Sequence, residues 1–395
     1  MSLSALFLVA GLAADPPPPP PNAHPIVLVG GFSVWGRDEV FGLKYWGGKR
    51  DLQEDLRAEG FPVVTAAPGP FSSNWDRACE VYAILKGGRV DYGKAHAAAH
   101  GHARFGRTYP ALLPTWGDST PKIHLLGHSM GGQTARMLTH LLVQGDEAER
   151  MATPDGELSP LFRGGNPWVS SVTTLATPHD GTTLTWRREG LVGPAQKLFA
   201  LATSLQRKQA RFYDVKLDHW GLTRMENEGS ATFLRRVFAS PLWQGPRDFS
   251  APELSPEGAR DFNARIRIQP GVFYFSWSTA KTRPDTKGHQ VPRFRMTPLW
   301  QPGARFMGRT IARPGHADLD GTWFRNDGVV NTRSMAGPST ETIRLFEGTP
   351  QRGEWNHMGV LEGWDHSEII GLGPEHGDEV LPFYRKWAQF LAGLD

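Results

Sequence analysis

Residues 122–142 restrict the fold more than any other segment, because an apolar run leads straight into a serine flanked by glycines. Ile123–Leu126 is short and nearly all apolar, which is typical of a strand buried on both faces. Gly127-His-Ser129-Met-Gly131 follows at once, and apolar residues then recur at helical spacing from Met137 to Leu142. This order predicts a strand, a sharp turn and a helix.

The turn predicts a nucleophile. Gly127 and Gly131 are required because side chains at a turn this tight would strike the neighbouring strand and helix. Ser129 is then held in a strained geometry with its Oγ exposed, and such a hydroxyl reacts when a histidine acts as its base. A phosphate-binding loop would need a lysine that is absent here. We therefore predict that Ser129 is a catalytic nucleophile.

Two backbone amides are predicted to stabilise negative charge beside Ser129. One belongs to Met130, because the residue after the nucleophile opens the following helix. The other is expected after the first strand, where Gly30 and Gly31 let a loop fold over the site. Phe32 is the candidate donor there, and an ordinary turn at the strand end is the alternative.

Five further short apolar runs predict the rest of a sheet. They are Ile26–Val29, Pro62–Ala66, Val169–Leu175, Val272–Ser276 and Thr342–Phe346. The lengths between the runs allow crossover helices, so we predict an α/β fold in which helices cover a mainly parallel sheet. Residues 285–320, rich in Pro, Gly, Arg and Trp, are expected to form a long irregular excursion. No break in composition divides the chain, so we expect one domain over residues 24–395.

The composition limits what the chain can bind and how its fold can be stabilised. With 395 residues, of which 39% are hydrophobic and 21% charged, the chain can bury a sizeable core. A net charge of +3 and the absence of basic runs with interleaved aromatic residues argue against a nucleic-acid partner. The single cysteine, Cys79, excludes an intrachain disulfide and a cysteine-rich metal site.

The N-terminal residues predict a leader that precedes the folded domain. Residues 1–14 form an apolar run too short to span a bilayer, and the prolines at 16–21 cannot form a core. We predict that residues 1–23 are a leader and that the protein is secreted. Because no positive charge precedes the apolar run, a trimmed N-terminus is the alternative. No later segment is suited to stable membrane insertion.

The base and the acid are expected downstream of Ser129, because this kind of site runs serine, acid, histidine along the chain. His366 is the best placed late histidine, with His357 and His376 as competitors. The residues alone leave six candidate acids: Asp180, Asp214, Asp218, Asp318, Asp320 and Asp327. Asp327 is attractive because a turn there leads into an apolar run, where a carboxylate can be fixed against an imidazole.

Several segments resemble the bacterial true lipases of the thermostable Geobacillus and staphylococcal type. They are Val40–Gly48, Ser73–Glu80, His96–Tyr109, Ala176–Thr183, Lys216–Leu222 and Asn326–Asn331. The resemblance runs from about residue 24 to the C-terminus and is weakest over residues 282–320. It implies an α/β-hydrolase fold in which the site residues are Ser129 as nucleophile, Asp327 as acid, His366 as base, and the amides of Phe32 and Met130 as oxyanion hole.

Two positions depart from the family pattern. The family usually has a histidine where this chain has Gly30, and often a glutamine where it has Met130, although staphylococcal members share the methionine. Because backbone amides are the donors in an oxyanion hole, neither change removes the expected chemistry.

The resemblance also implies a structural zinc. Taken alone, His96, His100 and His102 are equally typical of a solvated histidine-rich turn. With the Asp76 carboxylate, however, two imidazoles suit tetrahedral Zn²⁺. Family members bind zinc through residues matching Asp76, His96 and His102, and the fourth ligand, normally an aspartate, aligns with Glu253.

Calcium is the second metal that the resemblance implies. Family members bind it near the catalytic histidine through a glutamate that matches Glu368 and an aspartate two positions before the place of Glu375. Gly373 occupies that aspartate position here, and losing one carboxylate lowers the affinity of a calcium site. An ordinary surface role for Glu368 is the alternative.

The activity implied by the resemblance is that of a triacylglycerol lipase, which hydrolyses acylglycerol esters through an acyl-enzyme at a lipid–water interface. Apolar residues mixed with basic ones over residues 183–213 predict an amphipathic lid, with a core-packing helix as the alternative. Carboxylesterase or phospholipase activity at the same site is the nearest rival. A metal-dependent hydrolase using His96 and His102, or a non-catalytic binding module, would be a different class.

Overall fold

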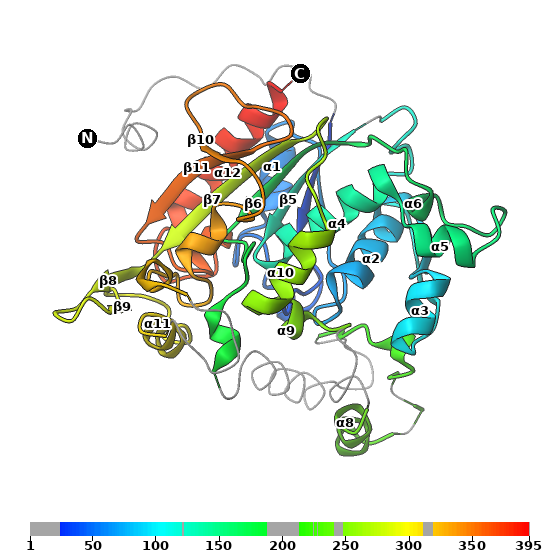
Figure 1. The fold of residues 1–395 in the computed structure, drawn as a ribbon, viewed down its shortest axis with the longest axis horizontal. Helices are drawn as coiled ribbons and strands as arrows, with labels where there is room; N and C mark the ends of the chain where they lie inside the picture. The colour runs from blue at the N-terminus through cyan, green and yellow to red at the C-terminus, as the bar shows by residue number, and fades with distance from the viewer. Residues whose placement is uncertain are drawn as a thin grey trace.

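The structure is a computed structural model that describes residues 24–120, 122–187, 213–223, 225–226, 228–240, 248–310 and 319–394. Its centre is a seven-stranded sheet in the order β10-β11-β7-β6-β5-β1-β2, in which every neighbouring pair is parallel (Figure 1). The strands are Ile343–Leu345 (β10), Trp355–Glu362 (β11), Phe273–Ala280 (β7), Val169–Leu175 (β6), Ile123–His128 (β5), Ile26–Val29 (β1) and Val63–Ala66 (β2). All carboxyl ends of the strands therefore point the same way, and sites of such sheets form beyond those ends.

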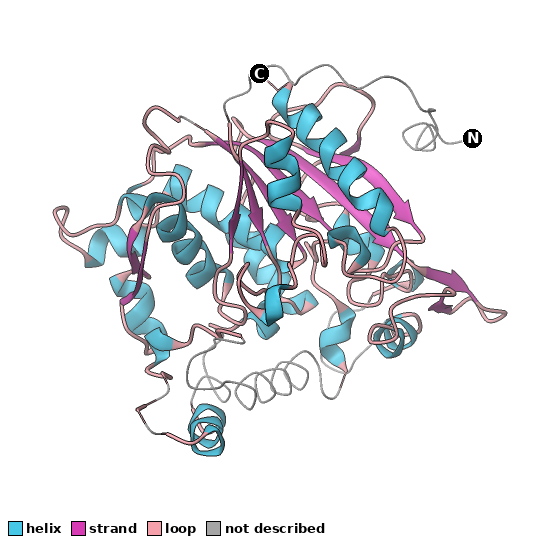
Figure 2. Cartoon of the chain, turned by 180° about the vertical axis from the view of Figure 1, so that it is seen from behind, coloured by secondary structure: helices cyan, strands magenta, loops and turns pink. Residues whose placement is uncertain are grey.

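Helices cover both faces of the sheet (Figures 1 and 2). One face carries α2 (Asn74–Lys86), α4 (Met130–Gln144) and α10 (Pro256–Arg265), and the other carries α1 (Leu52–Ala58) and α12 (Gly377–Ala392). The side chains of β1 show the division. Val27 and Val29 join the core that contains α2 and α4, whereas Ile26 and Leu28 join the core that contains α1 and α12. Burial on both faces requires apolar residues at successive positions, which explains the continuous apolar runs.

The remaining elements of the described residues lie outside this sheet. Two small antiparallel sheets of two strands each pair β3 (Gly88–Asp91) with β4 (Phe105–Tyr109) and β8 (Thr282–Pro284) with β9 (Gln290–Pro292). The other helices are α3 (Lys94–His100), α5 (Glu147–Ala152), α6 (Pro160–Arg163), α8 (Ser230–Phe238), α9 (Ser250–Glu253) and α11 (Gln301–Met307). The 3-10 helices are η2 (Val40–Gly42), η3 (Thr183–Trp186), η4 (Asp218–Trp220), η6 (Gly321–Trp323), η7 (Thr332–Met335) and η8 (Glu368–Ile370).

The predicted α/β fold is confirmed, and all six predicted apolar runs lie on strands of the sheet. β11, which lies inside the sheet between β10 and β7, is missing from the predicted set. The excursion over 285–320 is more regular than expected, since it includes β9 and α11. Most of the predicted lid, residues 188–212, lies outside the described residues, as does the predicted leader. In the described part of the chain, no helix combines the length and apolar character needed to cross a membrane.

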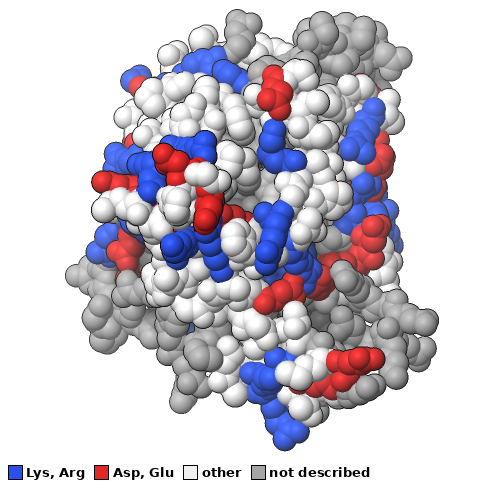
Figure 3. All heavy atoms as spheres, turned by 90° about the vertical axis from the view of Figure 1, so that its right-hand side faces the viewer, with Lys and Arg blue, Asp and Glu red and all other residues white. Residues whose placement is uncertain are grey.

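Basic and acidic side chains intermingle on the face that Figure 3 shows. Ion pairs between neighbours of opposite sign are common in the molecule. Arg104 lies 2.9 Å from Asp91, for example, and Arg107 contacts both Asp214 and Asp218. In the described part of that face, neither sign gathers into one continuous patch.

Candidate active site

The predicted strand, turn and helix around Ser129 are present. β5 ends at His128, Ser129 makes the turn, and α4 begins at Met130. Ser129 has φ 55° and ψ −131°, a strained conformation that residues with a side chain rarely adopt. The Ser129 amide donates to the Leu175 carbonyl (2.8 Å), and the Thr177 hydroxyl donates to the Ser129 carbonyl (2.8 Å). Backbone and side-chain hydrogen bonds thus hold the turn in place.

Two glycines make this turn possible. A Cβ on Gly127 would lie 2.4 Å from the carbonyl carbon of Gly131, and a Cβ on Gly131 would lie 2.1 Å from the carbonyl oxygen of Val29. Both distances are far shorter than any van der Waals contact, so only glycine fits at either position. The close packing of β1, the turn and α4 therefore depends on the two glycines that flank Ser129.

The Ser129 hydroxyl lies beside the imidazole of His366, which follows β11. Ser129 Oγ is 2.9 Å from His366 Nε2, and His366 Nδ1 is 2.8 Å from Asp327 Oδ2. Ser129 and His366 are each 6% exposed, and Asp327 is fully buried. Because a carboxylate only accepts hydrogen bonds, Nδ1 carries the imidazole proton and Nε2 accepts from the serine. This geometry suits general-base activation of the hydroxyl.

The Asp327 carboxylate is itself fixed by other donors. Oδ2 also accepts from the Thr279 hydroxyl (2.8 Å), while Oδ1 accepts from the amides of Val329 (2.9 Å) and Val330 (2.8 Å). The tight turn after Asp327, which made this residue attractive in the sequence, supplies the two amides. The orientation of the carboxylate toward His366 is therefore built into the turn.

The other described candidates for acid and base have partners elsewhere. Among the acids, Asp180 accepts from Asn263 and Ser339, Asp214 and Asp218 pair with Arg107, and Asp320 caps η6. Among the histidines, His357 Nδ1 lies 3.2 Å from Ser276 Oγ, and His376 Nδ1 lies 2.8 Å from Glu379 Oε1. Asp318 lies outside the described residues. The structure brings Asp327 and His366, and none of the other described candidates, to Ser129.

The two predicted oxyanion amides lie on segments that adjoin Ser129. Met130 follows the nucleophile at the start of α4. The loop that carries Phe32 passes close by, since a Cβ on Gly31 would lie 2.7 Å from Ser129 Cβ and 3.2 Å from Ser129 Oγ. Among the hydrogen bonds of the described residues, neither the Phe32 nor the Met130 amide is a donor. Both amides therefore remain available for a charge that develops beside Ser129.

A buried chain of hydrogen bonds, for which the sequence suggested no role, joins this loop to the base. The Gly31 amide donates to Tyr45 Oη (2.8 Å), Tyr45 Oη lies 2.8 Å from His128 Nδ1, and His128 Nε2 lies 2.9 Å from the His366 carbonyl oxygen. The carbonyl only accepts, so Nε2 donates and Nδ1 accepts from the tyrosine hydroxyl. Burial keeps the pKa of His128 well below its usual value, and the ring is neutral. The available signal was a histidine directly before the nucleophile.

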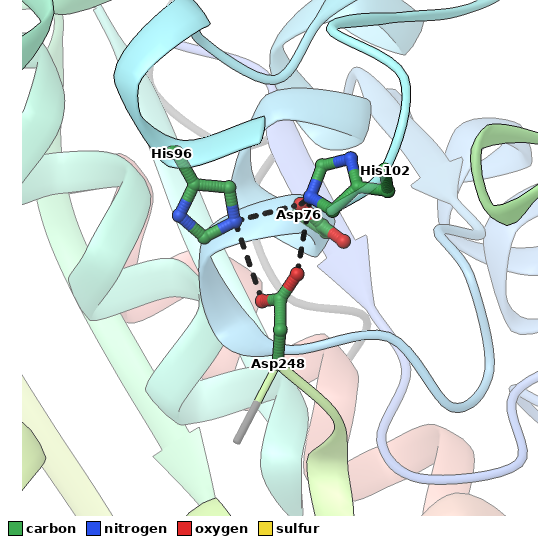
Figure 4. Close-up of side chains that lie close together, drawn as sticks. All are labelled: Asp76, His96, His102 and Asp248. Carbon is green, nitrogen blue, oxygen red and sulfur yellow. Dashed lines mark ion pairs between the residues drawn. The ribbon is translucent and has the colours of Figure 1, made fainter. Parts of the chain in front are cut away.

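A second group of polar side chains comes together between other elements (Figure 4). Asp76 lies on α2, His96 on α3, His102 just after α3 and Asp248 just before α9. Their ligand atoms all lie within 4.8 Å of one another. His96 Nε2 is 3.3 Å from Asp76 Oδ1 and from Asp248 Oδ1, and His102 Nε2 is 3.1 Å from Asp248 Oδ2. These four residues could hold a metal ion.

The hydrogen bonding of this group fits a metal. Asp76 Oδ1, His96 Nε2, His102 Nε2 and Asp248 Oδ2 are buried and lie at ion-pair distance from one another, but none of them makes a well-directed hydrogen bond among the described residues. A cation that binds all four atoms would satisfy them better than these contacts do. His102 Nδ1 lies 2.9 Å from the next residue's carbonyl oxygen, which keeps the proton there and presents the Nε2 lone pair to the group.

Glu253, the predicted fourth ligand, does not belong to this group, and Asp248 stands in its place. Glu253 Oε2 accepts instead from the backbone amide (2.7 Å) and the side-chain amide (2.8 Å) of Asn74, the first residue of α2. Burial raises the pKa of Glu253 to about 7. Burial also opposes ionisation of Asp248, but His102 and His96 lower its pKa nonetheless. Of the two candidates for the fourth ligand, the charged carboxylate next to the histidines is therefore Asp248.

The residues at the implied calcium position do not fit Ca²⁺. Glu368, Glu375 and His376 do come together. However, Lys281 Nζ already lies 2.6 Å from Glu368 Oε1 and 2.7 Å from Glu375 Oε2. Calcium takes about six to eight oxygen ligands, whereas this group offers two carboxylates and an imidazole around an ammonium. With the ammonium in place, this group therefore does not match the calcium site that the resemblance implies.

Known proteins share this sequence and fold. Residues 22–392 match the family model described as lipase-like, C-terminal domain. The chain is 35% identical to Lipase 2 of Staphylococcus aureus over 385 residues, which are 94% of this chain and 53% of that protein. It therefore spans about half the length of the curated relatives it matches.

Three solved structures are similar over almost their whole length. EstA from Clostridium botulinum has a TM-score of 0.87 and 40% identity, covering 99% of this chain and 94% of that one. Lipase 1 from Pelosinus fermentans has a TM-score of 0.84 and 45% identity, covering 95% of this chain and 100% of that one. Staphylococcus hyicus lipase has a TM-score of 0.83 and 32% identity, covering 97% of this chain and 98% of that one. Because the family model spans nearly the whole sequence, this chain belongs to the lipase-like C-terminal domain family, which includes bacterial lipases of the staphylococcal type.

Proposed function

We propose that this chain is a triacylglycerol lipase, a serine hydrolase that cleaves the carboxylic ester bonds of acylglycerols. One observation carries the proposal: Ser129 Oγ, on a strained turn, lies 2.9 Å from His366 Nε2, and His366 Nδ1 lies 2.8 Å from the buried Asp327 carboxylate. Relatives that bear the name lipase support the substrate class.

Acylation begins when Ser129 Oγ attacks the ester carbonyl carbon while His366 Nε2 accepts the hydroxyl proton. The Asp327 carboxylate stabilises the resulting imidazolium and keeps the ring oriented. The former carbonyl oxygen becomes an oxyanion, which accepts hydrogen bonds from the Phe32 and Met130 amides. Collapse of the tetrahedral intermediate releases the alcohol with the proton from His366, and the acyl group remains on Ser129.

Deacylation repeats these steps with water in place of the serine. His366 accepts a proton from the water as its oxygen attacks the acyl carbon, and the same two amides stabilise the second oxyanion. Ser129 Oγ then leaves and regains the proton from His366. The products are a carboxylic acid and the free enzyme, so each bond change is balanced within the site.

We also propose that Asp76, His96, His102 and Asp248 bind one structural Zn²⁺ ion. Two carboxylates and two imidazoles suit tetrahedral zinc, and four protein ligands leave no coordination position for a substrate. When bound, the ion would cross-link α2, α3 and the segment before α9. The catalytic steps use only Ser129 and the groups around it, so the zinc site is a matter of stability.

We propose roles for two further segments. Residues 1–23 serve as an export leader, and residues 183–213 form a lid that opens at a lipid–water interface. The apolar run at residues 1–14 supports the leader, and the mixture of apolar and basic residues over 183–213 supports the lid. N-terminal sequencing of protein recovered from the culture fluid tests the leader. A mature N-terminus near residue 15 is expected, and retention of the intact chain in the cell would contradict it.

The nucleophile is tested by Ser129→Ala. We expect ester hydrolysis to fall roughly 10⁴-fold or more, because the acyl-enzyme cannot form. Ser170→Ala, which removes another buried serine on β6, is the matched control and should keep full activity. An organophosphonate should label wild type and Ser170→Ala but not Ser129→Ala. Hydrolysis by Ser129→Ala at the wild-type rate would reject the mechanism.

The reaction class is tested by comparing the phosphonate with a metal chelator. A serine lipase loses activity at once with the phosphonate, while brief chelation acts only through slow loss of structure. Immediate loss of activity on chelation, with resistance to the phosphonate, would identify a metal-dependent hydrolase at His96 and His102 instead.

The substrate class is tested by rates on esters of increasing acyl length, measured below and above the concentration at which the substrate forms an interface. A lipase is expected to prefer long acyl chains and to gain activity when the interface forms. Preference for short soluble esters without such a gain would identify a carboxylesterase, and cleavage of phospholipids in preference to triacylglycerols would identify a phospholipase.

A further inference from the structure

Lys281 is a buried cation that lies between two carboxylates close to the proposed active site. It follows β7 directly, and its side chain is 1% exposed. Its Nζ lies 2.6 Å from Glu368 Oε1 and 2.7 Å from Glu375 Oε2. Glu368 is fully buried, whereas the Glu375 side chain is 27% exposed. Burying a lysine is unfavourable unless its charge is matched, so this arrangement calls for an explanation.

The contacts of Lys281 reach the loops of both the acid and the base. Its backbone amide donates to the Asn326 carbonyl (3.1 Å), next to Asp327 in the chain. On the other side, Glu368 Oε2 accepts from the Asp365 amide (2.7 Å), next to His366. Lys281 is thus hydrogen-bonded through its backbone to the loop that carries Asp327. Through Glu368 it is also connected to the loop that carries His366.

The surroundings of Glu368 leave no space for a further carboxylate. A Cβ on Gly373 would lie 2.0 Å from Glu368 Cγ, so an aspartate at position 373 would collide with Glu368. An open pocket of about 690 Å³ meets the group from outside and is lined by Lys281, Glu375 and His376 among others. The position between the carboxylates therefore adjoins this pocket and is filled by the ammonium.

We propose that the Lys281 ammonium takes the place of a bound divalent cation: it holds Glu368 and Glu375 together, positions His366 against Asp327, and makes hydrolysis independent of calcium. The inference rests on the proposed esterase site for its catalytic part. Lys281 touches neither substrate nor the reacting atoms, so it is a positioning residue. Its removal leaves two carboxylates facing each other beside an open pocket, where a divalent cation can bind with water molecules as its remaining ligands.

The test uses Lys281→Met, which keeps an apolar side chain as far as the Cε position and removes the ammonium, so the place of Nζ between the carboxylates is left open. Arg295→Met is the matched control, because Arg295 Nη1 also approaches Glu375 (3.3 Å) but its side chain is 56% exposed. Rates on a soluble ester are measured in buffer freed of calcium on a chelating resin, with the zinc content of each protein checked, and then with calcium added up to millimolar concentration.

Wild type and Arg295→Met should show the same kcat with and without calcium. Lys281→Met should lose kcat about tenfold in calcium-free buffer, with KM little changed, and millimolar calcium should restore most of the loss. Lys281→Arg should stay near wild type. Activation of wild type by calcium, or an unchanged kcat in Lys281→Met, would overturn the proposal.

Two further measurements keep the proposal decidable. If Lys281→Met does not fold, Glu375→Gln removes one partner from the partly exposed side and should lower kcat about threefold without a change in KM.

In a Ser129→Ala background, calcium should raise the melting temperature of Lys281→Met but not that of the parent chain. This second readout needs no activity, so it decides the role of Lys281 even if the proposed ester hydrolysis is wrong. A parent chain that calcium stabilises would reject the role of Lys281.

Discussion

His128 stands between the loop that carries the Phe32 amide and the backbone of the proposed base. In the chain from Gly31 through Tyr45 and His128, the Tyr45 hydroxyl accepts one hydrogen bond and donates another, and every donor meets an acceptor. Leaving a buried donor or acceptor unpaired costs about 1–3 kcal/mol. Because none of these groups touches the reacting atoms, breaking the chain should displace catalytic groups rather than weaken substrate binding.

Tyr45→Phe is the sharpest test of this chain, since it removes the hydroxyl and keeps the ring. The Gly31 amide and His128 Nδ1 both lose their partner, so we expect kcat to fall about tenfold with little change in KM, as about 1.4 kcal/mol corresponds to a factor of ten. Steady-state rates on a soluble ester measure both constants.

Tyr274→Phe is the matched control for Tyr45→Phe. It also removes a buried hydroxyl that accepts from a backbone amide, that of Gln269, but Tyr274 lies at the amino end of β7, away from the catalytic edge of the sheet. Its kcat should equal that of wild type. Equal kcat losses in the two variants would show that the effect is one of general stability.

The two acidic residues near α9 differ in what they are expected to bind. Asp248→Asn should lower zinc affinity at least about tenfold, because it removes a charged ligand. Glu253→Gln should keep one zinc per chain, since the glutamine can still accept from Asn74. Zinc retained after dialysis against graded chelator measures both. The reverse order of retention would restore Glu253 as the ligand.

The sequence could not distinguish these two residues. Asp248 and Glu253 are acids five positions apart, and the choice depends on where α9 begins. The helix starts at Ser250, so Asp248 lies on the extended segment before it and Glu253 is carried onto its last turn, toward Asn74. Helix boundaries are the feature that a sequence predicts least well. A shift of the start of α9 by about one turn would exchange the positions of the two carboxylates.

At the scale of elements, the four proposed zinc ligands lie around a helix that has little stability of its own. α3 has seven residues, too few for an isolated helix, and Gly93 gives it no side-chain cap. The amides of Ala95 and His96 donate to the Glu149 carboxylate, which fixes the start of the helix. An ion bound by His96 on the helix and His102 just after it would tie this segment firmly to Asp76 and Asp248.

Removal of zinc should therefore loosen α3 and the turn after it while the sheet stays intact. We expect faster amide hydrogen exchange over residues 94–102 and a lower melting temperature in chelated protein. Exchange in β5 and β6 serves as the internal reference and should not change. Identical exchange at residues 94–102 with and without chelation would show that the four side chains need no metal.

β11 shows why one central strand escaped prediction. Its sequence mixes apolar residues with Asn356, His357 and Glu362, so it lacks the continuous apolar run of β1, β5 or β6. The structure satisfies the polar members locally, because Asn356 donates to the Tyr274 carbonyl and His357 lies beside Ser276. Polar residues with partners can occupy a buried strand, and the partners are known only once the sheet is assembled.

At the scale of the whole molecule, the candidate site joins residues that are far apart in the sequence. Ser129 follows β5 and was predictable because strand, glycines and helix adjoin it in the chain. His366 follows β11, and its approach to Ser129 depends on the order of strands in the sheet. Three late histidines were therefore candidates for the base. The resemblance to known lipases selected His366 among them, whereas spacing along the chain could not.

Burial of neutral histidines in the core also gives the whole molecule a dependence on pH. Burial lowers the pKa of His124 to about 3 and holds those of His128 and His179 well below their usual value. In the unfolded chain a histidine has a pKa of about 6.5. Between these values the unfolded chain binds protons that the folded chain does not, so acidification favours unfolding.

The free energy of unfolding should therefore fall as the pH is lowered below about 6.5, and each of the three histidines should contribute about one proton to the slope, or about 1.4 kcal/mol per pH unit. His124→Asn isolates one of them, because Asn retains a group near Nδ1 that can bond Ser171 and cannot be protonated. Urea unfolding of both proteins at several pH values between 5 and 8 measures the two slopes. Acid loss of zinc affects both proteins alike, so the difference between the slopes reports His124 alone. Parallel slopes would mean that His124 takes up a proton as readily in the folded chain as in the unfolded one.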